Sequence, residues 1–181
     1  WLVDDEGRSY FIQKHPKSQP HKLLGEARVR IVYGGGNVGV MGILADEALA
    51  RGVHVTGVIP RSMVDVELAH TGIQRLVIVE TMHERKAVMW RECDGILALP
   101  GGVGTLDELF EAMTWNQLKL QRRPIGLLDV PVAGGTFYQG LVSLLSTGLR
   151  HGLVLERTLE LMVTGDEAGD LLDRLVALGA G

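Results

Sequence analysis

Residues 96–108 read I-L-A-L-P-G-G-V-G-T-L-D-E, an apolar run followed by three glycines, a threonine and two acids. The run at 96–99 predicts a buried strand, and the apolar spacing after Thr105 predicts a helix. The glycines therefore lie between a strand and a helix, where backbone N–H groups can hold a phosphate at the positive end of the helix dipole. The carboxylate of Glu108 follows one turn further along. The stretch thus predicts a phosphorylated ligand on which some chemistry is done.

The same alternation of strand and helix runs through the chain from residue 29 onward. Short apolar runs predict strands at residues 29–33, 53–59, 76–79, 96–99, 125–128 and 159–163. Helical spacing predicts helices at residues 38–51, 82–93, 105–120, 137–150 and 166–178. Nearly continuous apolar strands that alternate with helices indicate a doubly wound, Rossmann-like α/β fold, a parallel sheet with helices on both faces.

The composition is that of one soluble globular domain, since 46% of the 181 residues are hydrophobic and 22% are charged. We expect a single Rossmann-like nucleotide-binding domain over residues 1–181. Residues 1–22 fit the pattern poorly, with only a weak strand candidate at 9–13, and residues 23–28 are a candidate for the end of a first helix. The first β–α unit is therefore expected to be altered, shortened or poorly ordered.

The net charge of −4 and the isoelectric point near 5.9 argue against nucleic acid or an anionic membrane as the partner, because both need a cationic face. No apolar run approaches the roughly 20 residues that span a bilayer, and residues 1–20 are too polar for a signal peptide. Cys93 is the only cysteine, which excludes an internal disulfide and suits a reducing compartment. We expect a cytoplasmic protein.

Loops that directly follow strands are the expected binding positions, because ligands of such sheets lie beyond the carboxyl ends of parallel strands. The loop at 34–39 reads G-G-G-N-V-G and contains the G-x-G-x-x-G pattern of dinucleotide sites. A nicotinamide cofactor is the less favoured interpretation, since no acid follows the next strand to hold a ribose hydroxyl. The glycines otherwise allow a tight turn with close packing, or contact a mononucleotide. In the latter case Gly35 and Gly36 bind the ligand.

Residues 81–86 read T-M-H-E-R-K and open another helix after a strand. Thr81 and Glu84 have the spacing of a capping box. Arg85 and Lys86 run against the helix dipole, which prefers cations at the other end. The segment is therefore either a solvated charged turn or a place where cations face a ligand, since arginine binds phosphate or a base edge through its planar fork.

The second glycine loop, after the one at 34–39, contains Gly101, Gly102 and Gly104. Thr105 and Glu108 have the spacing of a capping box, which is the structural alternative for this loop. A cap does not explain the three glycines before the threonine, because these cost conformational entropy unless the backbone approaches something closely. If capping does not engage Glu108, the helix dipole favours its ionised form, which suits stabilising a cation or activating water. Glu67, taken alone, is interpreted as an exposed acid.

Other chemistries lack a supporting pattern. The six histidines and Cys93 show neither the H-E-x-x-H nor the Cys/His spacing of a metal site, so no metal is expected. The sequence contains no G-x-S-x-G elbow and no G-x-x-x-x-G-K-[ST] phosphate loop. Serine hydrolase and ATPase activities are therefore unsupported.

Three motifs in this order at strand ends resemble the LONELY GUY family. They are Y-G-G-G at 33–36 with G-V-M-G at 39–42, M-H-E-R-K at 82–86, and P-G-G-V-G-T-L-D-E at 100–108. The resemblance covers residues 23–178. Members of this family are cytokinin riboside 5′-monophosphate phosphoribohydrolases, often mislabelled as lysine decarboxylases.

The resemblance implies hydrolysis of the N-glycosidic bond of a purine nucleoside 5′-monophosphate, which yields an adenine-like or N6-substituted base and ribose 5-phosphate. It implies no organic cofactor and no metal. The catalytic pair falls on Arg85 in the M-H-x-R-K motif and on Glu108 at the end of P-G-G-x-G-T-x-x-E. The substrate-binding positions fall on Glu67, Arg85, Lys86, Gly101, Gly102, Val103, Gly104 and Thr105. Family members are commonly homodimers.

Two other function classes stay open. Family members usually begin with an apolar strand and a C-G-S-S-like loop that lines the nucleotide site, and no such segment precedes residue 23. A nucleotide-binding or carrier module without catalysis is therefore the first alternative. Amino-acid decarboxylation is the second, and it requires a lysine that binds pyridoxal phosphate, which no feature of the sequence identifies.

Overall fold

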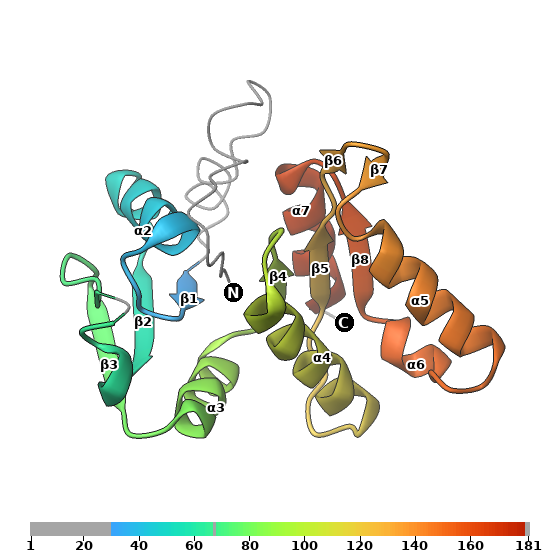
Figure 1. Cartoon of the computed structure of the whole chain (residues 1–181), viewed down its shortest axis with the longest axis horizontal. Coiled ribbons are helices and arrows are strands. Elements are labelled where there is room, and N and C mark those ends of the chain that lie inside the picture. Colours follow the sequence, from blue (N-terminus) through green and yellow to red (C-terminus); the bar gives the residue numbers. More distant parts are fainter. Residues whose placement is uncertain (1–29, 67, 180–181) are drawn as a thin grey trace. The chain divides into compact units, whose positions relative to one another are not determined.

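Parallel strands with helices packed against them make up both halves of the chain (Figure 1). The computed structural model describes residues 30–66 and 68–179. These fall into two compact units, one ending at Cys93 and the other beginning at Asp94, and each is described by itself. The predictions for residues 1–28 lie outside the described residues, and the single domain over 1–181 stays a prediction.

The first unit contains a three-stranded parallel sheet with β2 in the centre. Its elements are β1 (Ile31–Tyr33), α2 (Gly39–Ala50), β2 (Val55–Pro60), the 3-10 helix η1 (Arg61–Met63), β3 (Arg75–Val79) and α3 (Met82–Glu92). Every residue of β2 is buried, as expected for a strand covered on both faces. α3 contacts all three strands. β1 leads into the glycine loop at 34–39, and β3 leads into the charged segment at 81–86.

An ion pair joins β3 to the end of α3. Arg75 Nη1 donates to Glu92 Oε2 at 2.8 Å. This hydrogen bond lowers the pKa of the Glu92 carboxyl. The pair therefore stabilises the fold above the ordinary carboxyl pKa and weakens as the pH falls and Glu92 takes up a proton.

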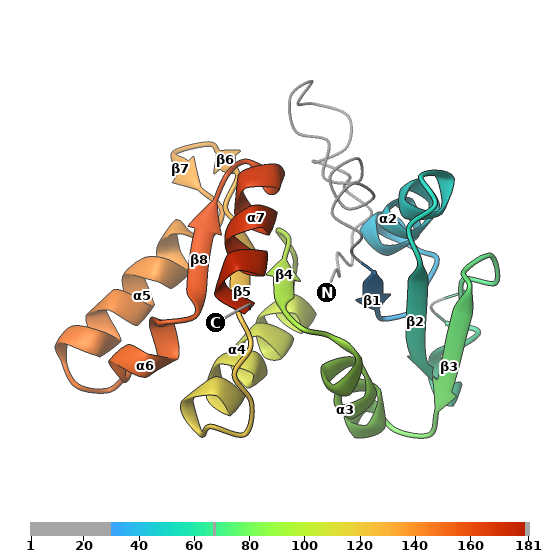
Figure 2. The same cartoon turned by 180° about the vertical axis from the view of Figure 1, so that it is seen from behind.

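The second unit contains another three-stranded parallel sheet, in the order β4-β5-β8, with β5 wholly buried. Its elements are β4 (Ile96–Ala98), α4 (Val103–Gln117), β5 (Ile125–Leu128), the hairpin strands β6 (Pro131–Val132) and β7 (Gly135–Thr136), α5 (Gln139–Arg150), α6 (Glu156–Leu159), β8 (Met162–Gly165) and α7 (Ala168–Gly179). α7 packs on β5 and β8. Figures 1 and 2 together show α4 and α7 on opposite sides of this sheet.

The predicted α/β class with parallel strands flanked by helices is confirmed. The predicted strand at 159–163 is wrong in its first residues, because Leu159 ends α6 and β8 begins at Met162. The buried Thr158 hydroxyl in α6 donates to Gln117 of α4, a tertiary contact that no local apolar pattern reveals. The β6–β7 hairpin and η1 were not predicted either, since two or three residues show no periodicity.

Within the described part of the chain, no helix is both long and apolar enough to cross a membrane. Among the same residues, no group of three or more His, Cys, Asp or Glu side chains is arranged to hold a metal ion.

Candidate functional site

The first glycine loop makes a tight turn directly after β1. Gly35 has φ +80°, a left-handed conformation that favours glycine. A Cβ on Gly57 of β2 would lie 2.7 Å from the Gly35 Cα, so the two backbones approach as closely as glycine allows. The tight turn and close packing are thus observed, while ligand binding by Gly35 and Gly36 stays a prediction.

Residues 68–70, a short segment after η1, pair with this loop. The Asn37 N–H donates to the Leu68 carbonyl at 3.0 Å, and the His70 N–H donates to the Gly35 carbonyl at 2.9 Å. These two bonds form an isolated antiparallel bridge between Gly36 and Ala69. The predicted binding residue Glu67 lies next to this segment in sequence but outside the described residues.

His70 holds the same segment from its side chain. The buried ring places Nε2 3.0 Å from Asp46 Oδ1 on α2, and Nδ1 accepts the Gly72 N–H at 3.1 Å. Since Nδ1 accepts, the bonding assigns the ring proton to Nε2, which donates to the carboxylate. Nδ1 therefore holds the backbone at Gly72, and Nε2 anchors the ring to α2.

Arg85 projects from α3 toward β2 and the loop that follows β1. Its side chain is buried, with 4% of the residue surface exposed. Nε donates to the Val58 carbonyl at 3.1 Å, and Nη2 donates to the Gly34 carbonyl at 3.0 Å. The solvated-turn interpretation is therefore wrong for Arg85, because its guanidinium ties β2 to the first glycine loop. The neighbouring Lys86 is half-buried on the same helix.

The sequence pattern did not single out Gly34, whose carbonyl accepts a hydrogen bond from Arg85. A Cβ at this position would lie 1.9 Å from Arg85 Nη2, so only glycine leaves room for the guanidinium. The run of three glycines pointed to this loop. It could not single out the glycine that faces the arginine, because that contact joins positions 51 residues apart.

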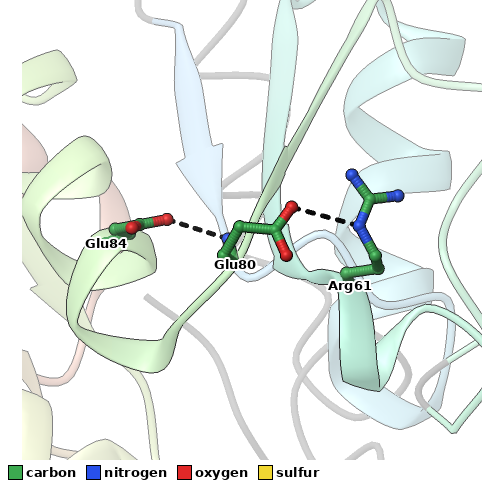
Figure 3. A network of polar contacts seen from close by, with 3 residues as sticks. All are labelled: Arg61, Glu80 and Glu84. Atoms are coloured by element: carbon green, nitrogen blue, oxygen red, sulfur yellow. Dashed lines mark hydrogen bonds and ion pairs between the residues drawn. The ribbon is translucent and has the colours of Figure 1, made fainter.

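The N-cap predicted at Thr81 is confirmed at the start of α3. The return bond from Glu84 reaches the N–H of Glu80, one residue before the N-cap (Figure 3). Thr81 Oγ1 accepts the Glu84 N–H at 3.1 Å, and Glu84 Oε2 accepts the Glu80 N–H at 2.8 Å. The Glu80 carboxylate in turn accepts from Arg61 Nε at 3.1 Å. The cap satisfies backbone donors at the start of α3 and so sets the direction of the helix that bears Arg85.

Replacing Thr81 with alanine should lower the free energy of unfolding by about 1 kcal/mol, because the Glu84 N–H loses its capping oxygen. Thr81→Ser is the matched control, since it keeps the hydroxyl and should retain most of the stability. Urea denaturation of both variants measures the difference. Equal stability of the alanine and serine variants would contradict the assigned cap.

The helix after the second glycine loop, α4, begins at Val103, earlier than the predicted start at Thr105. Gly102 is the N-cap and Val103 the first helical residue, and the Leu106 N–H donates to the Gly102 carbonyl at 3.2 Å. The predicted helix start at Thr105 is therefore two residues too late, and the alternative in which Thr105 and Glu108 form a capping box is excluded. A glycine cap has no side chain to cover the first-turn N–H groups. This backbone is suited to an anion.

Thr105 and Glu108 are buried three residues apart on one face of α4, and Glu108 is 8% exposed. Val103, in contrast, is 80% exposed, while Gly101, Gly102 and Gly104 are half-buried. The second unit thus brings together the predicted residues 101–105 and Glu108 along one loop and helix. The first unit brings together Arg85 and the loop that contains Gly35 and Gly36.

Parallel strands that lead into glycine loops and helices define a Rossmann-type α/β protein. The family model described as possible lysine decarboxylase matches residues 41–175. A cytokinin riboside 5′-monophosphate phosphoribohydrolase of Arabidopsis thaliana is 39% identical over 155 residues, which are 86% of this chain and 70% of that protein. One of Oryza sativa subsp. japonica is 38% identical over 154 residues, 85% of this chain and 62% of its own length. The chain belongs to the LONELY GUY family of these proteins.

Solved structures agree on the fold. A molybdenum cofactor binding protein from Rippkaea orientalis has a TM-score of 0.60 at 19% identity, over 92% of this chain and 90% of that one. The X-ray structure of a structural-genomics target has a TM-score of 0.62 at 19% identity, over 87% of this chain and 83% of that one. At this identity the likeness extends to the fold alone.

Proposed function

We propose that this protein hydrolyses the N-glycosidic bond of adenosine 5′-monophosphates, including N6-substituted ones, and releases the free adenine or cytokinin base and ribose 5-phosphate. Membership of the family and the names of its relatives support this reaction. The observation that carries the proposal is the start of α4. A glycine cap leaves first-turn N–H groups suited to a phosphate, and the buried carboxylate of Glu108 follows on the same helix.

In the proposed reaction the backbone of residues 102–105 holds the 5′-phosphate. The bond between C1′ and the base nitrogen breaks, and its electron pair leaves with the base. Positive charge develops on the ribose ring, where the Glu108 carboxylate stabilises it or orients the attacking water. The water oxygen forms the new bond to C1′, one of its protons is released, and the departing nitrogen is protonated.

Arg85 is the second group to which we assign a catalytic role. Arginine stays protonated, so it acts as an electrostatic clamp on the phosphate or the departing base and not as a proton donor. Its bonds to the Gly34 and Val58 carbonyls support a fixed orientation of the guanidinium. Lys86, Glu67, Gly35 and Gly36 complete the proposed substrate-binding set.

Base release tests the proposal directly. The purified protein is incubated with AMP and with isopentenyladenine riboside 5′-monophosphate, and free base is measured by chromatography. We expect release from both, and much less from adenosine, which lacks the phosphate. Tight binding of the monophosphates without base release would instead support the non-catalytic nucleotide-binding module.

We also propose that the protein acts in the cytoplasm as a homodimer. The absence of a possible internal disulfide is consistent with a reducing compartment. Leucines exposed on and just after α5 support a second copy of the chain as the partner, namely Leu144, Leu149, Leu153 and Leu155. Light scattering should then give twice the chain mass of 19.7 kDa, and the monomer mass would contradict it.

A further inference from the structure

A buried tyrosine in the second unit contacts the residue that precedes the second glycine loop. Tyr138 is 1% exposed and occupies the N-cap position of α5. Its hydroxyl donates to the carbonyl of Leu99, 39 residues earlier in the chain. Burial raises the pKa of this phenol above its ordinary value, with a further contribution from the nearby charge of Asp129. The hydroxyl therefore keeps its proton and remains a donor at neutral pH.

The Leu99 carbonyl is the group through which the peptide before Pro100 can be held in place. The next residue is Pro100, which has no N–H, so this carbonyl is the only hydrogen-bonding group of their shared peptide unit. The register of β4 with β5 ends one residue earlier, at Ala98. The contact with Tyr138 thus orients the Leu99–Pro100 peptide, one residue before Gly101.

The position of Tyr138 is itself determined by Asp129, which directly follows β5. One carboxylate oxygen of Asp129 accepts the Tyr138 N–H, and the other accepts the Thr136 hydroxyl at 2.7 Å. The Asp129 N–H donates to the Gly165 carbonyl of β8 at 2.8 Å. The ring of Phe137 packs edge-on against Tyr138, with centroids 4.9 Å apart. The start of α5 is therefore fixed to the sheet, and through Tyr138 so is the entrance to the glycine loop.

We propose that Tyr138, held by Asp129, is a positioning residue for the phosphate-binding backbone at residues 101–105. Its hydroxyl orients the Leu99–Pro100 peptide so that the following glycines and the first turn of α4 present their N–H groups to the phosphate. This inference rests on the proposed function, because it assigns the 5′-phosphate of the substrate to this loop.

Tyr138→Phe tests the inference, since it keeps the ring and removes only the hydroxyl. We expect the KM for AMP and the inhibition constant of ribose 5-phosphate each to rise about tenfold, equivalent to about 1.4 kcal/mol. We expect kcat to stay within about twofold, because the phosphate is held alike in the ground state and the transition state.

Three further variants separate positioning from a general loss of stability. Thr158→Val removes another buried hydroxyl of the same unit, which donates to Gln117, and should lower stability without raising either constant. Asp129→Ala should reproduce the effect of Tyr138→Phe. Asp129→Asn should largely restore both constants, because its amide oxygen can still accept the Tyr138 N–H. If Tyr138→Phe does not fold, the difference in both constants between Asp129→Ala and Asp129→Asn tests the inference in its place.

Unchanged constants in Tyr138→Phe, or an equal rise in Thr158→Val, would overturn the inference. Calorimetric titration with AMP separates this failure from failure of the proposed function. Wild-type protein that binds AMP but releases no base contradicts the function only, and the Kd values of the variants then decide the inference. Wild-type protein that binds neither AMP nor ribose 5-phosphate has no phosphate subsite and contradicts both.

Discussion

Replacing Glu108 with glutamine should lower kcat for base release at least a hundredfold while the protein stays folded. Glutamine has nearly the same shape but no charge, so it cannot stabilise the positive charge that develops on the ribose. A preorganised group of this kind contributes on the order of 3 kcal/mol to the stability of a transition state. Because Glu108 is 8% exposed, little water is present at its side chain to screen the carboxylate.

Asp107→Asn is the matched control for this variant. Asp107 is an acid on the same helix, but it is exposed, and its removal should leave kcat within about twofold because exposed charges are screened. Steady-state kinetics with AMP and a thermal melt of each variant make the comparison. A Glu108→Gln variant with near-normal kcat would contradict the catalytic role of this residue.

Replacing Gly34 with alanine should both destabilise the protein and reduce base release. The added methyl would lie 1.9 Å from Arg85 Nη2, so the guanidinium must move and lose its bond to the Gly34 carbonyl. Leaving such a buried charged donor without this acceptor costs about 1–3 kcal/mol. If Arg85 clamps the substrate as proposed, kcat/KM should also fall at least about tenfold, which corresponds to about 1.4 kcal/mol of lost transition-state stabilisation.

Gly140→Ala is the comparison for Gly34→Ala. Gly140 lies exposed in α5, and a Cβ there would meet nothing within 4 Å. This variant should be at least as stable as the wild type, because alanine loses less conformational entropy than glycine on folding. Urea denaturation and the base-release assay measure both variants. Gly34→Ala protein with wild-type stability and activity would contradict the assigned contact with Arg85.

The strands and the two glycine loops were predictable because their patterns are local. The apolar run at 96–99 predicted β4 within one residue, and the spacing of Thr81 and Glu84 predicted the cap of α3. Such features depend on residues a few positions apart, for which periodicity and side-chain chemistry are sufficient. The family also followed from short motifs at strand ends.

The start of α4 shows where local patterns fail. Thr105 and Glu108 have the spacing of a capping box, yet both are buried and the helix begins at Val103. The local pattern predicts that a threonine will cap wherever an acid follows at the right distance. It cannot reveal that both side chains lie on the buried face of the helix, because burial depends on the neighbouring elements.

The amino-acid sequence by itself therefore determined the α/β class, the two glycine loops and the residues to which we assign the chemistry. The tertiary structure alone decided which atoms orient those loops. Arg85 reaches the Gly34 carbonyl across 51 positions, and Tyr138 reaches the Leu99 carbonyl across 39. These bonds join distant segments that only the packing of helices on the sheets brings together, and no spacing in a sequence records that packing.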